Sequence, residues 1–142
     1  MKTLLGCMSV LAMVITLAAV SFAREAVWVS EGGLTYRDLK VGSGAVAETG
    51  KIAVIHFTGW VDSNGKRGEK FFDSREDGKP VAFKIGADMV IEGWNLGVAG
   101  MQEGGRRRLM VPAKLGYGAR GAADIVPPNA DLIYDIELIE VR

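Results

Sequence analysis

Cysteine is nearly absent from this chain, since its 142 residues include a single one, Cys7. Cys7 lies in an apolar stretch, residues 3–20, that follows Lys2 and precedes the small residues Ser21 and Ala23. This pattern predicts a secretory signal peptide over residues 1–23, with an uncleaved membrane anchor or lipid attachment at Cys7 as the alternatives. The predicted mature chain has no thiol, which excludes a disulfide framework and a zinc thiolate site.

The chain also lacks an excess of either charge, because 17 Lys and Arg residues are balanced by 17 Asp and Glu residues. A formal net charge of 0 argues against a nucleic acid or an anionic membrane as partner. The basic run 106–108 lies in a predicted strand, and we interpret it as a solvated face.

Motifs of hydrolases and nucleotide-binding proteins are missing as well. The one histidine, His56, lies in a predicted strand without a serine-elbow motif, so we interpret it as a structural residue. The lysines and glycines do not match the spacing of phosphate-binding or dinucleotide-binding loops. The sequence therefore predicts no cofactor and no metal ion.

What the sequence does contain is a set of short β-like segments around one short helix. Alternation of apolar and polar residues predicts strands near residues 34–39, 51–61, 81–85, 106–111 and 131–141. Residues 24–32 are expected to be a loose N-terminal arm, and residues 62–70 a turn lengthened by a charged insertion. Val90, Trp94 and Val98 recur at a spacing of four and predict one apolar helix face, while Gly93 and Gly97 suggest close contact with another element.

These elements predict an α+β fold in a single domain, residues 33–142. A curved antiparallel sheet of about five strands would wrap around one short helix on its concave face. Removal of residues 1–23 from 142 leaves 119, which suits one hydrophobic core.

A group of apolar residues is candidate core or candidate site. The group consists of Phe57, Phe72, Phe83, Val90, Ile91, Trp94, Tyr117, Ile125, Val126 and Tyr134. Half or more of these residues are expected to belong to the hydrophobic core. Two features favour a binding pocket. Tyr117 and the pair Ile125 and Val126 lie in a long loop rich in glycine and proline, and Asp73 adds a polar group beside Phe72.

Seven ordered segments carry a resemblance to a known family. They are residues 54–59 (VIHFTG), 72–74 (FDS), 90–94 (VIEGW), 97–101 (GVAGM), 115–118 (LGYG), 125–130 (IVPPNA) and 135–138 (DIEL). Over residues 33–138 the chain closely resembles the FKBP-type peptidyl-prolyl cis-trans isomerases, the immunophilins that bind tacrolimus and rapamycin.

The resemblance implies a pocket between sheet and helix and a role for each of its residues. Trp94 would form the floor and Tyr117, Ile125 and Val126 the mouth. The walls would be Phe57, Phe72, Phe83, Val90, Ile91 and Tyr134. The backbone amide of Ile91 would bond a substrate carbonyl, and Asp73 and the Tyr117 hydroxyl would face the ligand, so that Asp73, Ile91, Trp94 and Tyr117 form the catalytic set.

Two departures from the family pattern affect the pocket. Phe57 stands where many members have tyrosine, and Val81 where many have phenylalanine. We expect isomerase activity to be kept and affinity for macrolides such as tacrolimus or rapamycin to be weaker.

The expected function is acceleration of X-Pro bond rotation in proline-containing polypeptides by a small exported monomer, secreted or located in the bacterial periplasm. The alternative is a module that binds proline segments, or a holdase chaperone, with little turnover. A third possibility is that the pocket is filled core.

Overall fold

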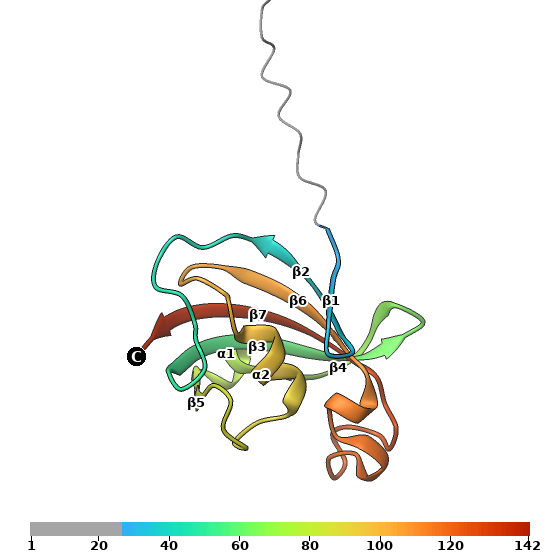
Figure 1. Cartoon of the computed structure of the whole chain (residues 1–142). Helices are drawn as coiled ribbons and strands as arrows, with labels where there is room; N and C mark the ends of the chain where they lie inside the picture. The colour runs from blue at the N-terminus through green and yellow to red at the C-terminus, as the bar shows by residue number, and fades with distance from the viewer. Residues whose placement is uncertain (1–26) are drawn as a thin grey trace, which may run out of the picture.

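The computed structural model describes residues 27–142, so the expected signal peptide and the start of the expected arm lie outside the described residues. Within them, seven antiparallel strands form one curved sheet, with α2 packed on its concave face (Figure 1). The strands are β1 (Val29–Glu31), β2 (Leu34–Lys40), β3 (Ile52–Ser63), β4 (Lys66–Asp73), β5 (Val81–Lys84), β6 (Arg106–Val111) and β7 (Leu132–Val141). Their order is β1-β2-β6-β7-β3-β4, and β5 pairs with one end of β3. The predicted α+β class is confirmed.

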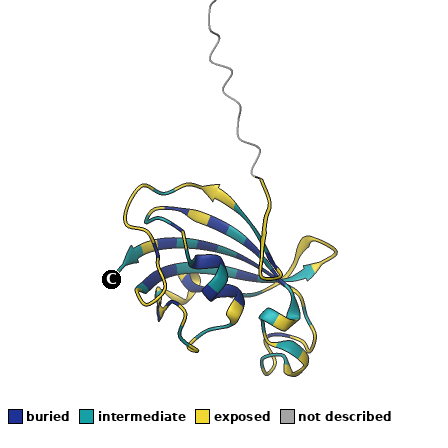
Figure 2. Cartoon of the chain, viewed as in Figure 1, coloured by how far each residue is buried: buried dark blue, intermediate teal, exposed yellow. Residues whose placement is uncertain are grey.

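Four short helical segments connect the strands. They are α1 (Ser74–Asp77), α2 (Glu92–Val98) and the 3₁₀ turns η1 (Ala113–Leu115) and η2 (Gly118–Arg120). Buried residues line the concave side of the central strands and the inner face of α2 (Figure 2). In the described part of the chain, no helix is long and apolar enough to span a membrane.

Two strands replace segments that were expected to be irregular. Residues 66–73 form β4 because Asn64 and Gly65, with φ of 54° and 82°, make the tight turn that folds the chain back along β3. The expected charged insertion is thus one arm of a hairpin. Residues 29–31, inside the expected arm, pair with β2 as β1.

The predicted helix is present but begins later than its apolar spacing indicated. It starts at Glu92, so Val90 precedes it, and of the three spaced apolar residues only Trp94 and Val98 are buried residues of the helix. The expected close contact is present, because a Cβ added at Gly97 would lie 2.5 Å from Cδ1 of Leu109 on β6.

The basic run in β6 is not a uniformly solvated face. Alternation along the strand exposes Arg106 but turns Arg107 inward, where 7% of it is exposed. Arg107 donates to Asp38 Oδ1 at 2.7 Å and to the Gly97 and Ala99 carbonyls at 3.0 and 3.3 Å. This arginine therefore ties the C-terminus of α2 to the sheet.

Candidate active site

An aromatic cluster occupies the space between the concave face and α2. Trp94 is at its centre, with ring centroids 4.6 Å from Phe57, 5.4 Å from Tyr134 and 5.7 Å from Phe83. Phe72 stacks on Phe57 at 5.1 Å. Such edge-to-face and stacked contacts fix the orientation of each ring, so the cluster forms a rigid surface.

A β-bulge brings two adjacent phenylalanines to this surface. Neighbouring residues of a regular strand face opposite sides, yet Phe71 and Phe72 both line the same cavity. The register passes from Gly59 opposite Phe72 to Trp60 opposite Lys70, which leaves Phe71 as the extra residue. Gly59 makes room for it, because a Cβ there would lie 2.5 Å from Phe71 Cζ.

The first cavity has a volume of about 260 Å³ and is mainly apolar. Its lining consists of Phe57, Phe71, Phe72, Val81, Trp94, Tyr117, Ala122, Ile125, Val126 and Tyr134. The loop between β6 and β7 supplies the rim. Val126 is buried there, whereas Tyr117 and Ile125 are 39% and 54% exposed and border the opening.

A second cavity, of about 390 Å³, adjoins the first and shares Trp94 and Tyr117 with it. The residues before α2 complete it: Asp88, Met89, Val90 and Ile91. Within residues 27–142, the Ile91 amide makes no hydrogen bond, since the first turn of a helix has no carbonyl acceptors for its N–H groups. A free donor therefore lies beside the aromatic floor.

Two tyrosines, Tyr117 and Tyr134, line the first cavity. Tyr134 is only 1% exposed. Its pKa is raised far above the usual value, first because the phenol is buried and further because the Tyr117 hydroxyl interacts with it. The Tyr134 phenol is therefore neutral at physiological pH and can orient the hydroxyl of Tyr117.

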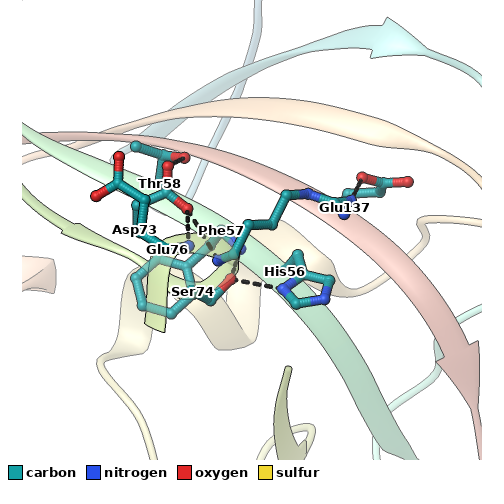
Figure 3. A network of polar contacts seen from close by, with 8 residues as sticks. His56, Phe57, Thr58, Asp73, Ser74, Glu76 and Glu137 are labelled. Carbon is teal, nitrogen blue, oxygen red and sulfur yellow. Dashed lines mark hydrogen bonds and ion pairs between the residues drawn. The ribbon is translucent and has the colours of Figure 1, made fainter. Parts of the chain in front are cut away.

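The Asp73 carboxylate lines neither cavity and belongs to a polar network at the start of α1 (Figure 3). Asp73 is the N-cap of α1: its Oδ1 accepts from the amides of Arg75 and Glu76 at 2.9 and 3.3 Å, and its Oδ2 accepts from Thr58 Oγ1 at 3.3 Å. Burial opposes ionisation, but these hydrogen bonds outweigh it and lower the Asp73 pKa. The carboxylate thus stabilises the junction of β4 and α1.

Ser74 fastens the same junction to β3 (Figure 3). Its buried Oγ accepts from the Phe57 amide at 2.8 Å and lies 2.8 Å from Nδ1 of His56. His56 is on the strand face opposite the aromatic cluster. Its contacts agree with the structural role inferred from the sequence.

Comparison with known proteins identifies the family. The family model of the FKBP-type peptidyl-prolyl cis-trans isomerases matches residues 44–139. This chain belongs to that family. An FK506-binding protein of Neisseria meningitidis serogroup B is 43% identical over 110 residues, which cover 78% of this chain and 97% of that protein.

Solved structures of FKBP-type folds agree with this assignment. The structure of AtFKBP13 superposes with a TM-score of 0.71 at 37% identity, covering 82% of this chain and 99% of that one. FkpA from Escherichia coli superposes with a TM-score of 0.72 at 31% identity. There the match covers 85% of this chain but only 54% of FkpA.

Most of the residues predicted for the FKBP pocket lie together. Seven line the first cavity: Phe57, Phe72, Trp94, Tyr117, Ile125, Val126 and Tyr134. Val90 and Ile91 line the second. Phe83 lines neither cavity, because it lies at the edge of Trp94 with 1% of its surface exposed, and Asp73 is turned toward α1. The catalytic roles of these residues remain predictions.

Several lining residues of the FKBP pocket were not predicted as site residues. Phe71 was missed because strand alternation assigns it to the opposite face, and only the bulge overrides that rule. Ala122, Asp88 and Met89 lie in loops without an apolar pattern. The double phenylalanine at 71–72, followed by Asp73, is the one sequence signal that could have revealed the bulge.

Proposed function

We propose that the first cavity binds the proline side of an X-Pro bond and lowers the barrier to its rotation without covalent chemistry. The observation that supports this most directly is the apolar cavity of about 260 Å³. Four aromatic side chains of the sheet line it, and the Trp94 indole of α2 packs against two of them. The prolyl ring would rest on Trp94.

The physical basis is a difference in polarity between the planar and twisted amide. Rotation about the C–N bond has a barrier of about 18–20 kcal/mol because it removes amide resonance. The twisted amide is less dipolar than either planar form, so an apolar cavity that excludes water favours it over the planar amide. Binding of the twisted form in preference to the planar forms accelerates rotation, and no general base is needed.

We further propose two hydrogen-bond donors that hold the substrate backbone. The free Ile91 amide would bond one flanking carbonyl in the second cavity. The Tyr117 hydroxyl, oriented by Tyr134, would bond another at the shared rim. Asp73 would contribute by holding Phe72 and α1 in place. With Trp94, these groups make up the catalytic set proposed from the sequence.

The substrates proposed are proline-containing segments of exported polypeptides, acted on by a monomer outside the cytoplasm. The same cavity would accept macrolides such as tacrolimus or rapamycin. Affinity for them would be reduced, because Val81 offers less contact area than the phenylalanine of many relatives and Phe57 lacks a hydroxyl.

A protease-free isomerisation assay on a short X-Pro peptide tests this proposal. Tyr117→Phe removes one hydrogen bond worth about 0.5–1.5 kcal/mol, so kcat/KM should fall about two- to tenfold. Trp94→Phe keeps an aromatic floor but removes contact area and should reduce kcat/KM further. Trp28→Phe is the matched control, because Trp28 lines neither cavity.

The holdase alternative gives a different result in the same experiments. Wild-type protein would then suppress aggregation of a refolding client but leave the isomerisation rate equal to that in buffer. Equal rates for wild type and buffer, with the fold verified by circular dichroism, would exclude the enzyme mechanism.

A further inference from the structure

The face of the sheet opposite α2, the convex face, is strongly basic although the chain has a formal net charge of 0. Two hollows on it are lined by six cations: Arg37, Lys66, Arg67, Arg75, Arg106 and Arg108. The carboxylates in these linings, Asp135 and Glu137, are each paired with an arginine. Within residues 27–142, no ion pair involves the other four cations, Arg37, Lys66, Arg67 and Arg106.

The larger hollow has a volume of about 380 Å³, and we call it the convex groove. Its lining is Trp28, Arg37, Gly65, Lys66, Arg67, Arg108, Met110 and Ile133. Arg37 and Trp28 come from the β1–β2 side, and Lys66 and Arg67 come from the β3–β4 hairpin. Met110 on β6 is half-buried and Trp28 is 44% exposed, so these two side chains supply an apolar patch, whereas Ile133, directly opposite Met110 on β7, is only 1% exposed. The groove therefore combines unpaired cations with apolar surface.

Tryptophan rings position two of these cations. The Arg37 guanidinium lies 4.9 Å from the centre of the Trp28 ring, and that of Arg67 lies 5.0 Å from Trp60. Stacking uses the flat face of a guanidinium and leaves the N–H groups on its edge available. Among the described residues, the buried Nε of Arg37 has no hydrogen-bond acceptor. The Arg37 side chain is therefore fixed in place with a donor that is not satisfied.

The strand register leaves the groove with excess positive charge. Arg37 on β2 is directly opposite Arg108 on β6, and like charges so placed repel one another. On its other side Arg108 is opposite Asp135 of β7, whose carboxylate accepts from Arg108 at 2.6 and 2.8 Å. That bidentate pair neutralises Arg108 alone. The charge of Arg37 is uncompensated, and a carboxylate in the groove would neutralise it.

We infer that the convex groove binds an acidic segment of a polypeptide in which carboxylates alternate with apolar side chains. Carboxylates match the edges of the stacked guanidinium groups, and apolar side chains match the accessible surface of Met110 and Trp28. A phosphate chain would leave this apolar patch uncovered. Bases of a nucleic acid would compete with the arginines that lie over both tryptophan rings. The inference rests on the proposed function only in assuming a polypeptide ligand.

Fluorescence anisotropy with a labelled, proline-free peptide of alternating glutamate and leucine tests the assignment. We expect saturable binding that weakens with added salt. The double variant Arg37→Gln with Arg67→Gln should weaken binding about tenfold or more, because it removes charge-assisted hydrogen bonds. The matched control, Lys84→Gln with Arg142→Gln, removes the same charge from residues outside both hollows and should bind like wild type.

The outcomes separate this inference from the proposed function. Three results would overturn the inference. The first is an equal loss of peptide binding in both double variants, and the second is no binding by the wild type. The third is groove-dependent binding of a single-stranded oligonucleotide in place of the peptide. Circular dichroism and an unchanged kcat/KM on a short X-Pro peptide show that the variants fold. Peptide binding by a wild-type protein without isomerase activity would support the groove and contradict the proposed function.

Discussion

The function of Asp73 can be decided by substitutions that separate its charge from its hydrogen bonds. In the structure its carboxylate caps α1 and accepts from Thr58, and it lines neither cavity. Asp73→Leu removes all of these bonds. Asp73→Asn removes the charge but keeps an oxygen that can accept from the Arg75 and Glu76 amides, and asparagine is as good an N-cap as aspartate.

The magnitudes follow from the bonds that each substitution removes. Loss of an N-cap costs about 1 kcal/mol and loss of the Thr58 hydrogen bond about 1 kcal/mol more, so Asp73→Leu should lower the free energy of unfolding by about 2 kcal/mol. Asp73→Asn should stay within about 0.5 kcal/mol of wild type because the cap is kept and the amide NH2 that replaces Oδ2 can donate to the Thr58 hydroxyl. Urea unfolding followed by circular dichroism measures both values.

Activity should follow the same order if Asp73 acts by positioning Phe72. We expect kcat/KM on an X-Pro peptide to fall in Asp73→Leu and to remain within about twofold of wild type in Asp73→Asn. Asp77→Asn, an equal charge change at an exposed residue of α1, is the control. The reasoning is refuted if Asp73→Asn unfolds like wild type yet loses as much kcat/KM as Asp73→Leu, since the charge itself would then act on the substrate.

Three further predictions concern the tyrosine pair, the contact of α2 with the sheet, and acid stability. Tyr134→Phe should reduce kcat/KM about two- to tenfold by freeing the Tyr117 hydroxyl, and adding Tyr117→Phe should then cost little more. Additive losses in that double-mutant cycle would contradict the coupling. Gly97→Ala should destabilise the fold by about 1–3 kcal/mol in urea unfolding, although alanine favours helix, because its Cβ would lie 2.5 Å from Leu109 Cδ1; wild-type stability would show that the helix can shift. Because the folded pKa of Asp73 is depressed, its contribution to stability is complete above the unfolded pKa of about 3.9 and is lost as the pH falls through the folded pKa. Urea unfolding at decreasing pH should therefore show a shallower decline in Asp73→Asn than in wild type, and identical slopes would contradict this.

The sequence predicted those parts of the fold where residue pattern and environment coincide. Strand alternation located β3, β6 and β7 within one or two residues, because one face of each packs on the core. β4 was missed because its first residues are charged and exposed, and its strand conformation comes from pairing with β3. Arg107 was predicted to be solvated because it is charged, yet it is buried. An ion pair with Asp38 and hydrogen bonds to two backbone carbonyls compensate the loss of its hydration.

For the candidate site, sequence motifs supplied residue identity and tertiary structure supplied orientation. Trp94, Phe57 and Tyr117 lie on one cavity, as the family resemblance implied. The direction of Asp73 was beyond prediction, because it depends on a one-turn helix whose amides compete for the carboxylate. Phe57 has no hydroxyl group that could donate a hydrogen bond to the Asp73 carboxylate from the cavity side. The carboxylate therefore accepts from the amides of α1 instead.

The bulge between β3 and β4 links the two faces of the sheet. It turns Phe71 into the concave aromatic cavity and leaves Trp60 on the convex face, where the hairpin residue Arg67 lies over it. Without the extra residue, Phe71 would point to the convex side and the first cavity would lose one of its aromatic walls. The first irregularity, made possible by the missing side chain at Gly59, therefore adds an aromatic wall to the apolar concave site, and Arg67, opposite Asp62 after a second register shift, belongs to the basic convex groove.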